Sequence, residues 1–313
     1  MSHIPQENPG RKSEGRAILW MILRSISTAF TKCMSGIPGC EVWMEPFGLS
    51  QFALTQLKKL GITDGPMSYV GHEEEFKVAA EEVEGYLPGT TFFPDRLPFA
   101  TIKKELEEST SKYVFVKDES YAISTDQRRQ FIPKGYQHAF LIRHPLLVYK
   151  SMRKGWFVQL LEADKLKFNE TDESSFDLRP YAKEDGVDIV FQKHHELWTY
   201  IRDHINPSPL VIDSSALLTN PAPVLQEFCE AVGFPYSESL LQWSGSPEVG
   251  KSWKWPCENA YKNEAFLGVA IYSTHFTPPA AVPPWEEVTD DVRELAEKAM
   301  PYYEDMFQHR LIG

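Results

Sequence analysis

Short apolar runs alternate along the chain with segments in which apolar residues recur at helical spacing. The runs occupy residues 17–23, 41–44, 113–116, 139–142 and 210–212. Continuous apolar runs, several of them bounded by Gly, Pro or Asn, are typical of parallel strands that are buried on both faces. The alternation predicts an α/β fold with three layers, in which helices flank a parallel sheet of five strands.

The segments of helical period predict seven helices. They are expected to follow Ser27, Leu49 and Pro145, and to cover residues 72–85, 188–204, 223–232 and 290–307. The last has the clearest pattern, because its apolar side chains recur every three or four residues and form one face. We interpret this face as a packing surface.

The length of 313 residues fits one large α/β domain. We expect this domain to span residues 17–313, preceded by a flexible polar tail at residues 1–16. Residues 155–186 are polar and weakly periodic, and residues 244–288 carry many Gly, Pro and Trp with little regular pattern. Both segments are interpreted as lids or pocket walls of the same domain.

The charge balance restricts the partners of the protein. The chain has 32 Lys and Arg against 44 Asp and Glu, which gives a net charge of -12. Such a surface repels nucleic acid and sulfated polysaccharides. A small acceptor molecule is therefore the expected partner, and neither nucleic acid nor a membrane is expected.

The cysteines show neither the spacing of a metal site nor that of a disulfide framework, which indicates reduced thiols. They are Cys33, Cys40, Cys229 and Cys257. The first apolar stretch is too short for a signal peptide, and no other stretch is long enough to span a membrane. We therefore expect a soluble cytoplasmic protein, and the sequence leaves its oligomeric state open, a homodimer included.

A turn rich in hydroxyl groups follows the first predicted strand. Residues 24–28 read Arg-Ser-Ile-Ser-Thr, and a helix is expected to begin there. The N–H groups at a helix N-terminus bind anions, and hydroxyl groups and an arginine strengthen such a site. An ordinary N-cap explains the serines and threonine equally well. The candidate phosphate-binding residues are Arg24, Ser25, Ser27 and Thr28.

A second candidate phosphate site follows the fourth predicted strand. Arg143 ends this strand, Pro145 can begin a helix, and Ser151 lies eight residues after the arginine. On such a helix, Arg143 and Ser151 can bracket one phosphate. The Walker sequence GxxxxGKS/T is absent, which argues against an ATP or GTP hydrolase that relies on Lys and Mg²⁺. No metal is expected.

These motifs together resemble the sulfotransferases that use 3′-phosphoadenosine-5′-phosphosulfate (PAPS). Residues 23–28 are similar to the family's loop that binds the 5′-phosphosulfate, and residues 143–151 to its element that binds the 3′-phosphate. Residues 211–235 resemble the segment after the family's late strand. The order and spacing of all three agree over about residues 17–243, and the resemblance implies a P-loop-type sulfotransferase fold.

The sequence departs from the family's pattern at three places. Ile26 stands where the family usually has Gly, His144 where it has Asp or Asn, and Ser215-Ala216 where it often has Glu-Asp. The change at Ile26 matters most, because a β-branched residue does not readily adopt a positive φ. Either the loop takes an ordinary backbone conformation at Ile26, or the approach of the phosphate is altered.

Transfer of a sulfuryl group to a hydroxyl needs cations and a base. Arg24 and Lys117 are the candidate cations. Lys117 resembles a functional lysine on the family's third strand, and a solvated turn is the alternative. Glu45 is the preferred base, because it ends a strand beside the first loop and its Glu-Pro-Phe turn resembles one branch of the family. Glu119 is the rival base, since it stands where cytosolic members have a catalytic His.

The C-terminal third offers weaker candidates. Lys251 and Trp253 resemble part of the family's C-terminal nucleotide-binding loop. His194 lies on the apolar face of a predicted helix and is interpreted as a core histidine. Several aromatic residues form either an acceptor pocket or a packed satellite core. They are Trp243, Trp253, Trp255, Tyr261, Phe266, Tyr272 and Phe276.

The sequence thus predicts an enzyme that uses PAPS as co-substrate, releases 3′-phosphoadenosine-5′-phosphate (PAP) and sulfates a hydroxyl of a small acceptor, aromatic acceptors included. One alternative is a P-loop-like small-molecule kinase or nucleotide hydrolase. Another is a protein that binds PAPS or PAP without turnover. No motif encodes the acceptor, because specificity is determined by the shape of the segments around the pocket.

Overall fold

Five parallel strands form the main sheet of the computed structural model, which describes residues 15–62, 67–166, 172–262 and 267–312. The strand order is β2-β4-β1-β5-β6. The strands are β1 (Gly15–Met21), β2 (Cys40–Met44), β4 (Tyr113–Glu119), β5 (Gln137–Ile142) and β6 (Leu210–Asp213). The predicted parallel sheet is confirmed. β1 begins two residues earlier than expected, and the rest of the predicted tail lies outside the described residues.

All seven predicted helices are present. They are α1 (Ser27–Met34), α2 (Pro46–Lys59), α3 (Glu73–Glu84), α6 (Pro145–Glu162), α8 (Val190–His204), α10 (Pro221–Val232) and α12 (Asp290–Gln308). The start of α2 lies at Pro46 instead of after Leu49, since proline is favourable in the first helical turn.

Several short elements were not predicted from the sequence. They are the helices α4 (Phe99–Glu108), α5 (Asp126–Arg129), α7 (Leu178–Glu184) and α9 (Ser214–Thr219), and the antiparallel pair of β3 (Thr91–Phe92) with β7 (Cys257–Glu258). Within the weakly periodic segment at residues 155–186, the first eight residues complete α6, and α7 also lies there.

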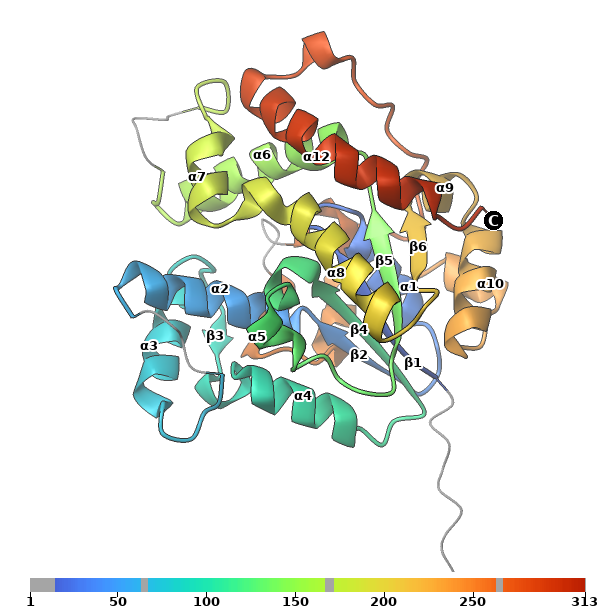
Figure 1. Cartoon of the computed structure of the whole chain (residues 1–313), viewed down its shortest axis with the longest axis horizontal. Helices are drawn as coiled ribbons and strands as arrows, with labels where there is room; N and C mark the ends of the chain where they lie inside the picture. The colour runs from blue at the N-terminus through green and yellow to red at the C-terminus, as the bar shows by residue number, and fades with distance from the viewer. Residues whose placement is uncertain (1–14, 63–66, 167–171, 263–266, 313) are drawn as a thin grey trace, which may run out of the picture.

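Helices cover both faces of the sheet and give three layers (Figure 1). Phe30 of α1 and Phe228 of α10 pack against Phe115 of β4, with ring centroids 5.8 and 6.5 Å away. On the other face, His194 of α8 packs edge-on against Phe140 of β5 at 5.3 Å. Because both faces are covered, the strands are buried on both sides, as their continuous apolar sequences predict.

The carboxyl ends of three neighbouring strands lie at one edge of the sheet. Met21 at the end of β1 pairs with Glu119 of β4, and Met44 at the end of β2 pairs with Lys117. The loop after β1, the turn after β2 and the end of β4 therefore meet, which is where α/β sheets bind ligands. None of the described helices combines the length and apolarity needed to cross a membrane.

Candidate functional site

The loop between β1 and α1 holds two residues in the left-handed backbone conformation. Arg24 has a φ of 67° and Ile26 a φ of 69°. Ile26 is the N-cap of α1, and no side chain caps this helix among the described residues. The ordinary conformation considered for Ile26 is therefore wrong. The loop keeps the conformation that a glycine adopts, and the β-branched residue bears the strain.

This loop presents several hydrogen-bond donors. Ser27 and Thr28 form the first turn of α1, where a helix leaves its N–H groups without internal partners. Ser25 is fully buried, and its hydroxyl has no hydrogen-bond partner among the described residues. The N-terminal end of the helix dipole adds partial positive charge. The loop is thus suited to an anion.

Two arginines from the two predicted phosphate sites meet beside the loop. Nε of Arg24 donates a hydrogen bond to Oγ of Ser151 at 3.1 Å, and Nη1 of Arg143 donates to the carbonyl oxygen of Arg24 at 2.6 Å. Burial lowers the pKa of both arginines, and the charge of Arg24 further lowers the pKa of Arg143. Within the described part of the chain, no carboxylate forms an ion pair with either guanidinium.

A cavity of about 130 Å³ opens beside this cluster, and both Arg24 and Glu119 line it. Most of the other lining side chains are apolar, among them Leu49, Phe52, Leu87, Trp156, Leu160 and Val190. Trp156 and Leu160 belong to the segment that the sequence assigned to a pocket wall. The cavity can therefore hold an apolar molecule with one polar group near Arg24 and Glu119.

Lys117 and Glu45 form a buried ion pair beneath the carboxyl edge of the sheet, and each is only 2% exposed. The N–H of Glu45 also donates to the carbonyl oxygen of Lys117 at 2.7 Å. The second carboxylate oxygen of Glu45 has no hydrogen-bond partner among the described residues. The solvated turn considered for Lys117 is thus wrong. Glu45 lies outside the lining of the cavity that contains Glu119.

Glu119 and Lys117 titrate in the low dielectric of this region. Burial raises the pKa of Glu119 to about 7, and the nearby charge of Lys117 opposes this rise. Burial lowers the pKa of Lys117 to about 7, an effect that the charges of Glu119 and Asp118 oppose. A carboxyl group with a pKa near neutrality is suited to general base chemistry.

Asp118 is a site residue that the sequence reasoning missed. Its carboxylate accepts hydrogen bonds from the N–H groups of Phe47 at 2.7 Å, Gly48 at 2.8 Å and Glu119 at 2.8 Å. Burial raises the pKa of Asp118 to about 7. The signal was indirect: α2 has no capping residue of its own before Pro46, so another element has to supply the cap.

The C-terminal candidates lie away from the phosphate loop. Nε1 of Trp253 donates to Oγ of Ser35 at 2.7 Å, and Ser35 ends α1. This helix is about 12 Å long, so Trp253 is far from the loop at its other end. Lys251 pairs with Glu248 at the surface. The structure thus places Trp253 beside the C-terminal end of α1 and Lys251 in a surface ion pair.

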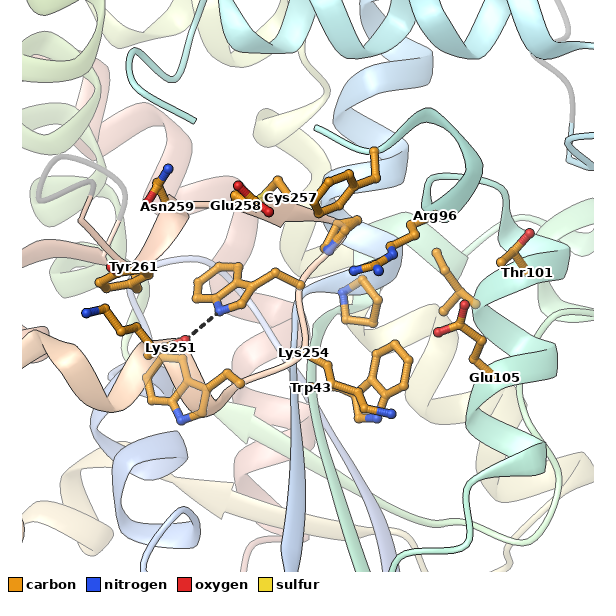
Figure 2. Close-up of a pocket in the computed structure, with 17 residues that line it drawn as sticks. Trp43, Arg96, Thr101, Glu105, Lys251, Lys254, Cys257, Glu258, Asn259 and Tyr261 are labelled. Atoms are coloured by element: carbon orange, nitrogen blue, oxygen red, sulfur yellow. Dashed lines mark hydrogen bonds between the residues drawn. The ribbon is translucent and has the colours of Figure 1, made fainter. Parts of the chain in front are cut away.

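The aromatic residues of the C-terminal third divide between a cavity and local packing. Trp253, Trp255 and Tyr261 line a second cavity of about 520 Å³ (Figure 2). Trp243 and Phe276 pack edge-on, with ring centroids 4.9 Å apart. Tyr272 is 45% exposed, and Phe266 lies outside the described residues.

The remaining candidates agree with structural roles. Nδ1 of His194 lies 2.6 Å from Oγ of Ser120, and its side chain is buried, so the interpretation as a core histidine is confirmed. All four cysteines lie within the described residues and are free thiols. Among the described side chains, no group of three or more His, Cys, Asp or Glu could hold a metal ion.

A match to one family model supports the resemblance seen in the sequence. Residues 185–310 match the model of a family described as Sulfotransferase domain. The chain is also similar to the sulfotransferase domain of the Synechococcus PCC 7002 olefin synthase, with 18% identity, a TM-score of 0.43 and coverage of 94% of this chain and 96% of that one. No curated protein sequence matches significantly.

A second similar structure is a sulfotransferase domain from the curacin biosynthetic pathway, with 12% identity and a TM-score of 0.42. The alignment covers 91% of this chain and 98% of that one. The match to the family model confirms the resemblance to sulfotransferases over the C-terminal part of the chain. It begins after α7 and ends beyond α12, so it contains neither the loop after β1 nor Arg143.

Proposed function

We propose that this chain, whose residues 185–310 match a sulfotransferase domain, transfers the sulfuryl group of PAPS to a hydroxyl of a small acceptor. The pair Arg24 and Arg143 carries the proposal. Both guanidiniums are half-buried beside a loop of hydrogen-bond donors, and no described carboxylate neutralises them. Two like charges in a partly desolvated site are unfavourable unless an anion binds between them. A donor with phosphate groups at both ends supplies that charge.

Each of the two proposed phosphate sites binds one end of the donor. Arg24 and the loop donors Ser25, Ser27 and Thr28 hold the 5′-phosphosulfate in this proposal. Arg143 and Ser151 hold the 3′-phosphate. The hydrogen bond from Arg24 to Ser151 supports this division, because it brings one residue from each proposed site together.

The reaction consists of one in-line displacement. The acceptor oxygen attacks the sulfur, the bond between sulfur and the bridging phosphate oxygen breaks, and PAP leaves with that oxygen. Arg24 stabilises the charge that develops on the leaving phosphate. The proton of the acceptor hydroxyl moves to a carboxylate base.

We assign the base role to Glu119 in preference to Glu45, which reverses the order expected from the sequence. Glu119 lines the cavity together with Arg24, so a hydroxyl placed there can reach both residues. Glu45 is buried in an ion pair with Lys117. In this proposal Glu45 neutralises Lys117, and Lys117 adjusts the pKa of Glu119.

The largely apolar lining of the cavity supports a small, uncharged acceptor. Apolar side chains exclude water from the sulfuryl group, which limits hydrolysis of the donor. The net charge of -12 further disfavours a polyanionic acceptor.

The donor assignment is tested by comparing PAP with adenosine 5′-phosphosulfate, which lacks the 3′-phosphate. Arg143→Ala should weaken PAP binding at least about tenfold, because a charge-assisted contact contributes roughly 1.5–3 kcal/mol. It should barely change binding of adenosine 5′-phosphosulfate. Arg202→Ala, at an exposed position on α8, is the control and should change neither affinity. Equal losses for both ligands in Arg143→Ala would contradict the assignment.

The alternative functions are separated by ligand choice and by turnover. PAP should raise the melting temperature of a PAPS-dependent enzyme strongly, whereas ATP with Mg²⁺ should do so for a kinase or nucleotide hydrolase. Transfer of label from sulfate-labelled PAPS to an acceptor distinguishes the enzyme from a protein that only binds the donor.

A further inference from the structure

The proposed reaction makes no use of the second cavity, whose volume is about 520 Å³. Its lining comes from four parts of the chain: Trp43 and Pro46 around the end of β2, Phe93 and Arg96 before α4, the α4 helix itself, and residues 250–261. Figure 2 shows Lys251 and Tyr261 at one end of the cavity, and Arg96, Thr101 and Glu105 at the other. No residue of the phosphate loop lines it, and neither Arg143 nor Ser151 does. This cavity is therefore distinct from the donor site.

Three indole rings form part of the cavity lining, and the protein already satisfies their N–H groups. Nε1 of Trp43 donates to Glu41 at 2.7 Å, Nε1 of Trp253 to Ser35 at 2.7 Å, and Nε1 of Trp255 to the carbonyl oxygen of Gly250 at 2.9 Å. The rings of Trp253 and Trp255 are stacked, with centroids 6.0 Å apart. The indoles thus offer apolar surface, which suits a planar aromatic ligand.

Three cations line the cavity, and two of them are already neutralised. Lys254 pairs with Glu41 at 3.1 Å, and Lys251 pairs with Glu248. Arg96 is exposed and lies over the Phe93 ring at 4.5 Å, and among the described residues no carboxylate forms an ion pair with it. Its guanidinium is the cation that remains available for an anionic ligand.

The acidic residues of the cavity limit the charge of that ligand. Glu105 and Glu258 also line it. A polyanion such as PAP would place charge near both carboxylates, whereas a single anionic group can bind Arg96 and avoid them. The volume lies within the usual range for small-molecule sites.

We propose that this cavity binds a planar aromatic compound with one sulfonate or carboxylate group. The anionic group pairs with Arg96, and the aromatic rings lie against the indole surfaces. The site is independent of the proposed transferase reaction, because the cavity is lined by none of the residues to which the proposed function gives a role in binding the donor or as the base.

Calorimetric titration of the full chain tests the proposal with two probes, naphthalene-2-sulfonate and the uncharged naphthalene-2-sulfonamide. The sulfonate should bind in one equivalent. Arg96→Gln should weaken sulfonate binding about tenfold or more and leave sulfonamide binding nearly unchanged. Lys104→Gln, an exposed α4 residue outside the cavity, should change neither.

Two further measurements separate this site from the donor site. Arg24→Ala and saturating PAP should both leave sulfonate binding unchanged. Displacement of the sulfonate by PAP would overturn the proposal, since the probe would then occupy the donor site. Absence of sulfonate binding, or equal losses of both probes in Arg96→Gln, would also overturn it. Arg96 is exposed, so the variant should fold, and an unchanged melting temperature verifies this.

Discussion

Ile26 is the residue at which local backbone preference and the fold disagree. Its φ of 69° places a β-branched residue in the left-handed region, which costs roughly 1–2 kcal/mol for residues other than glycine. Its side chain is partly buried against the core, and this packing offsets part of the cost. Strained residues of this kind concentrate at functional sites, and Ile26 lies in the middle of the proposed phosphate loop.

Replacing Ile26 by Gly and by Ala separates strain from packing. Both variants lose the side-chain contacts, but only glycine removes the strain, so Ile26→Gly should be more stable than Ile26→Ala by about 1 kcal/mol in urea unfolding. Ala29, inside α1, is the control, and there Ala29→Gly should lower the free energy of unfolding by about 0.5–1 kcal/mol. An alanine variant more stable than the glycine variant at Ile26 would contradict the left-handed conformation.

The choice between Glu119 and Glu45 as base predicts different kinetics for two matched variants. Glu119→Gln keeps the shape of the side chain but cannot accept a proton, so kcat should fall roughly 10²–10⁴-fold with PAP affinity nearly intact. Glu45→Gln should reduce kcat much less, because Glu45 only balances the charge of Lys117. Both variants are measured with one acceptor under saturating PAPS. An inactive Glu45→Gln beside a normal Glu119→Gln would return the base role to Glu45.

The pKa of Glu119 predicts a pH dependence with a definite sign. Glu119 accepts a proton only when ionised, and burial raises its pKa to about 7, so kcat/KM should rise with pH and level off above about 7. The charge of Lys117 opposes this rise in pKa. Lys117→Met should therefore shift the rise of kcat/KM to higher pH, whereas Lys117→Arg should leave the rise at the same pH.

The variant at Lys117 needs one precaution, because it would leave the buried Glu45 without its partner. Combining Lys117→Met with Glu45→Gln removes this second charge. In the double variant, kcat/KM should still rise at a higher pH than in the unmodified protein. If kcat/KM of the double variant still rises near pH 7, Lys117 does not change the pKa of the base.

At the scale of elements, the sequence predicted the strands from their continuous apolar runs and the long helices from apolar residues that recur at helical spacing. It missed α4, and it also missed α5, α7 and α9, which have four, seven and six residues and so give too few repeats to reveal a period. The two phosphate motifs were found because each lies within one strand–loop–helix unit. The place of Lys251 and Trp253 could not be predicted, because it depends on packing between segments distant in sequence. The burial of Glu45 and the capping by Asp118 depend on the same kind of contact.

Gly186 packs against Tyr121, which lines the cavity that also contains Arg24 and Glu119. The turn at Gly186 therefore helps to determine the shape of this cavity. A Cβ at Gly186 would lie 2.2 Å from the hydroxyl oxygen of Tyr121, which lines the cavity, and the φ of Gly186 is 72°. Gly186→Ala should therefore lower the free energy of unfolding by about 2–4 kcal/mol, from strain and overpacking together. It should also raise KM for the acceptor, since Tyr121 has to move.

Gly71→Ala is the matched control for this prediction. Gly71 has a φ of 86° and open space where its Cβ would lie, so only the backbone strain remains. Its cost should be about 1–2 kcal/mol, with KM unchanged. Equal costs at the two positions in urea unfolding would show that Tyr121 moves without resistance.

At the scale of the whole molecule, a buried ion pair joins the C-terminal helix α12 to α6. Nε of Arg153 on α6 donates to Oδ2 of Asp291 on α12 at 3.1 Å, and the same oxygen accepts from the N–H of Leu178 at 2.9 Å. Nη2 of Arg153 also donates to the carbonyl oxygen of Glu173 at 2.7 Å. This network thus connects α6 to α12 and to the start of α7.

We expect the effects of substitutions at Arg153 and Asp291 on the free energy of unfolding to be strongly coupled. Arg153→Met leaves a buried carboxylate without its partner, and Asp291→Asn leaves a buried guanidinium, so each should lower the free energy of unfolding by about 3–5 kcal/mol. The double variant should cost clearly less than the sum of the two, because neither charge then remains. The exposed pair Arg202 and Asp203 is the control, with an expected coupling below about 1 kcal/mol. Additive losses at Arg153 and Asp291 would mean that the two side chains stabilise α6 and α12 independently.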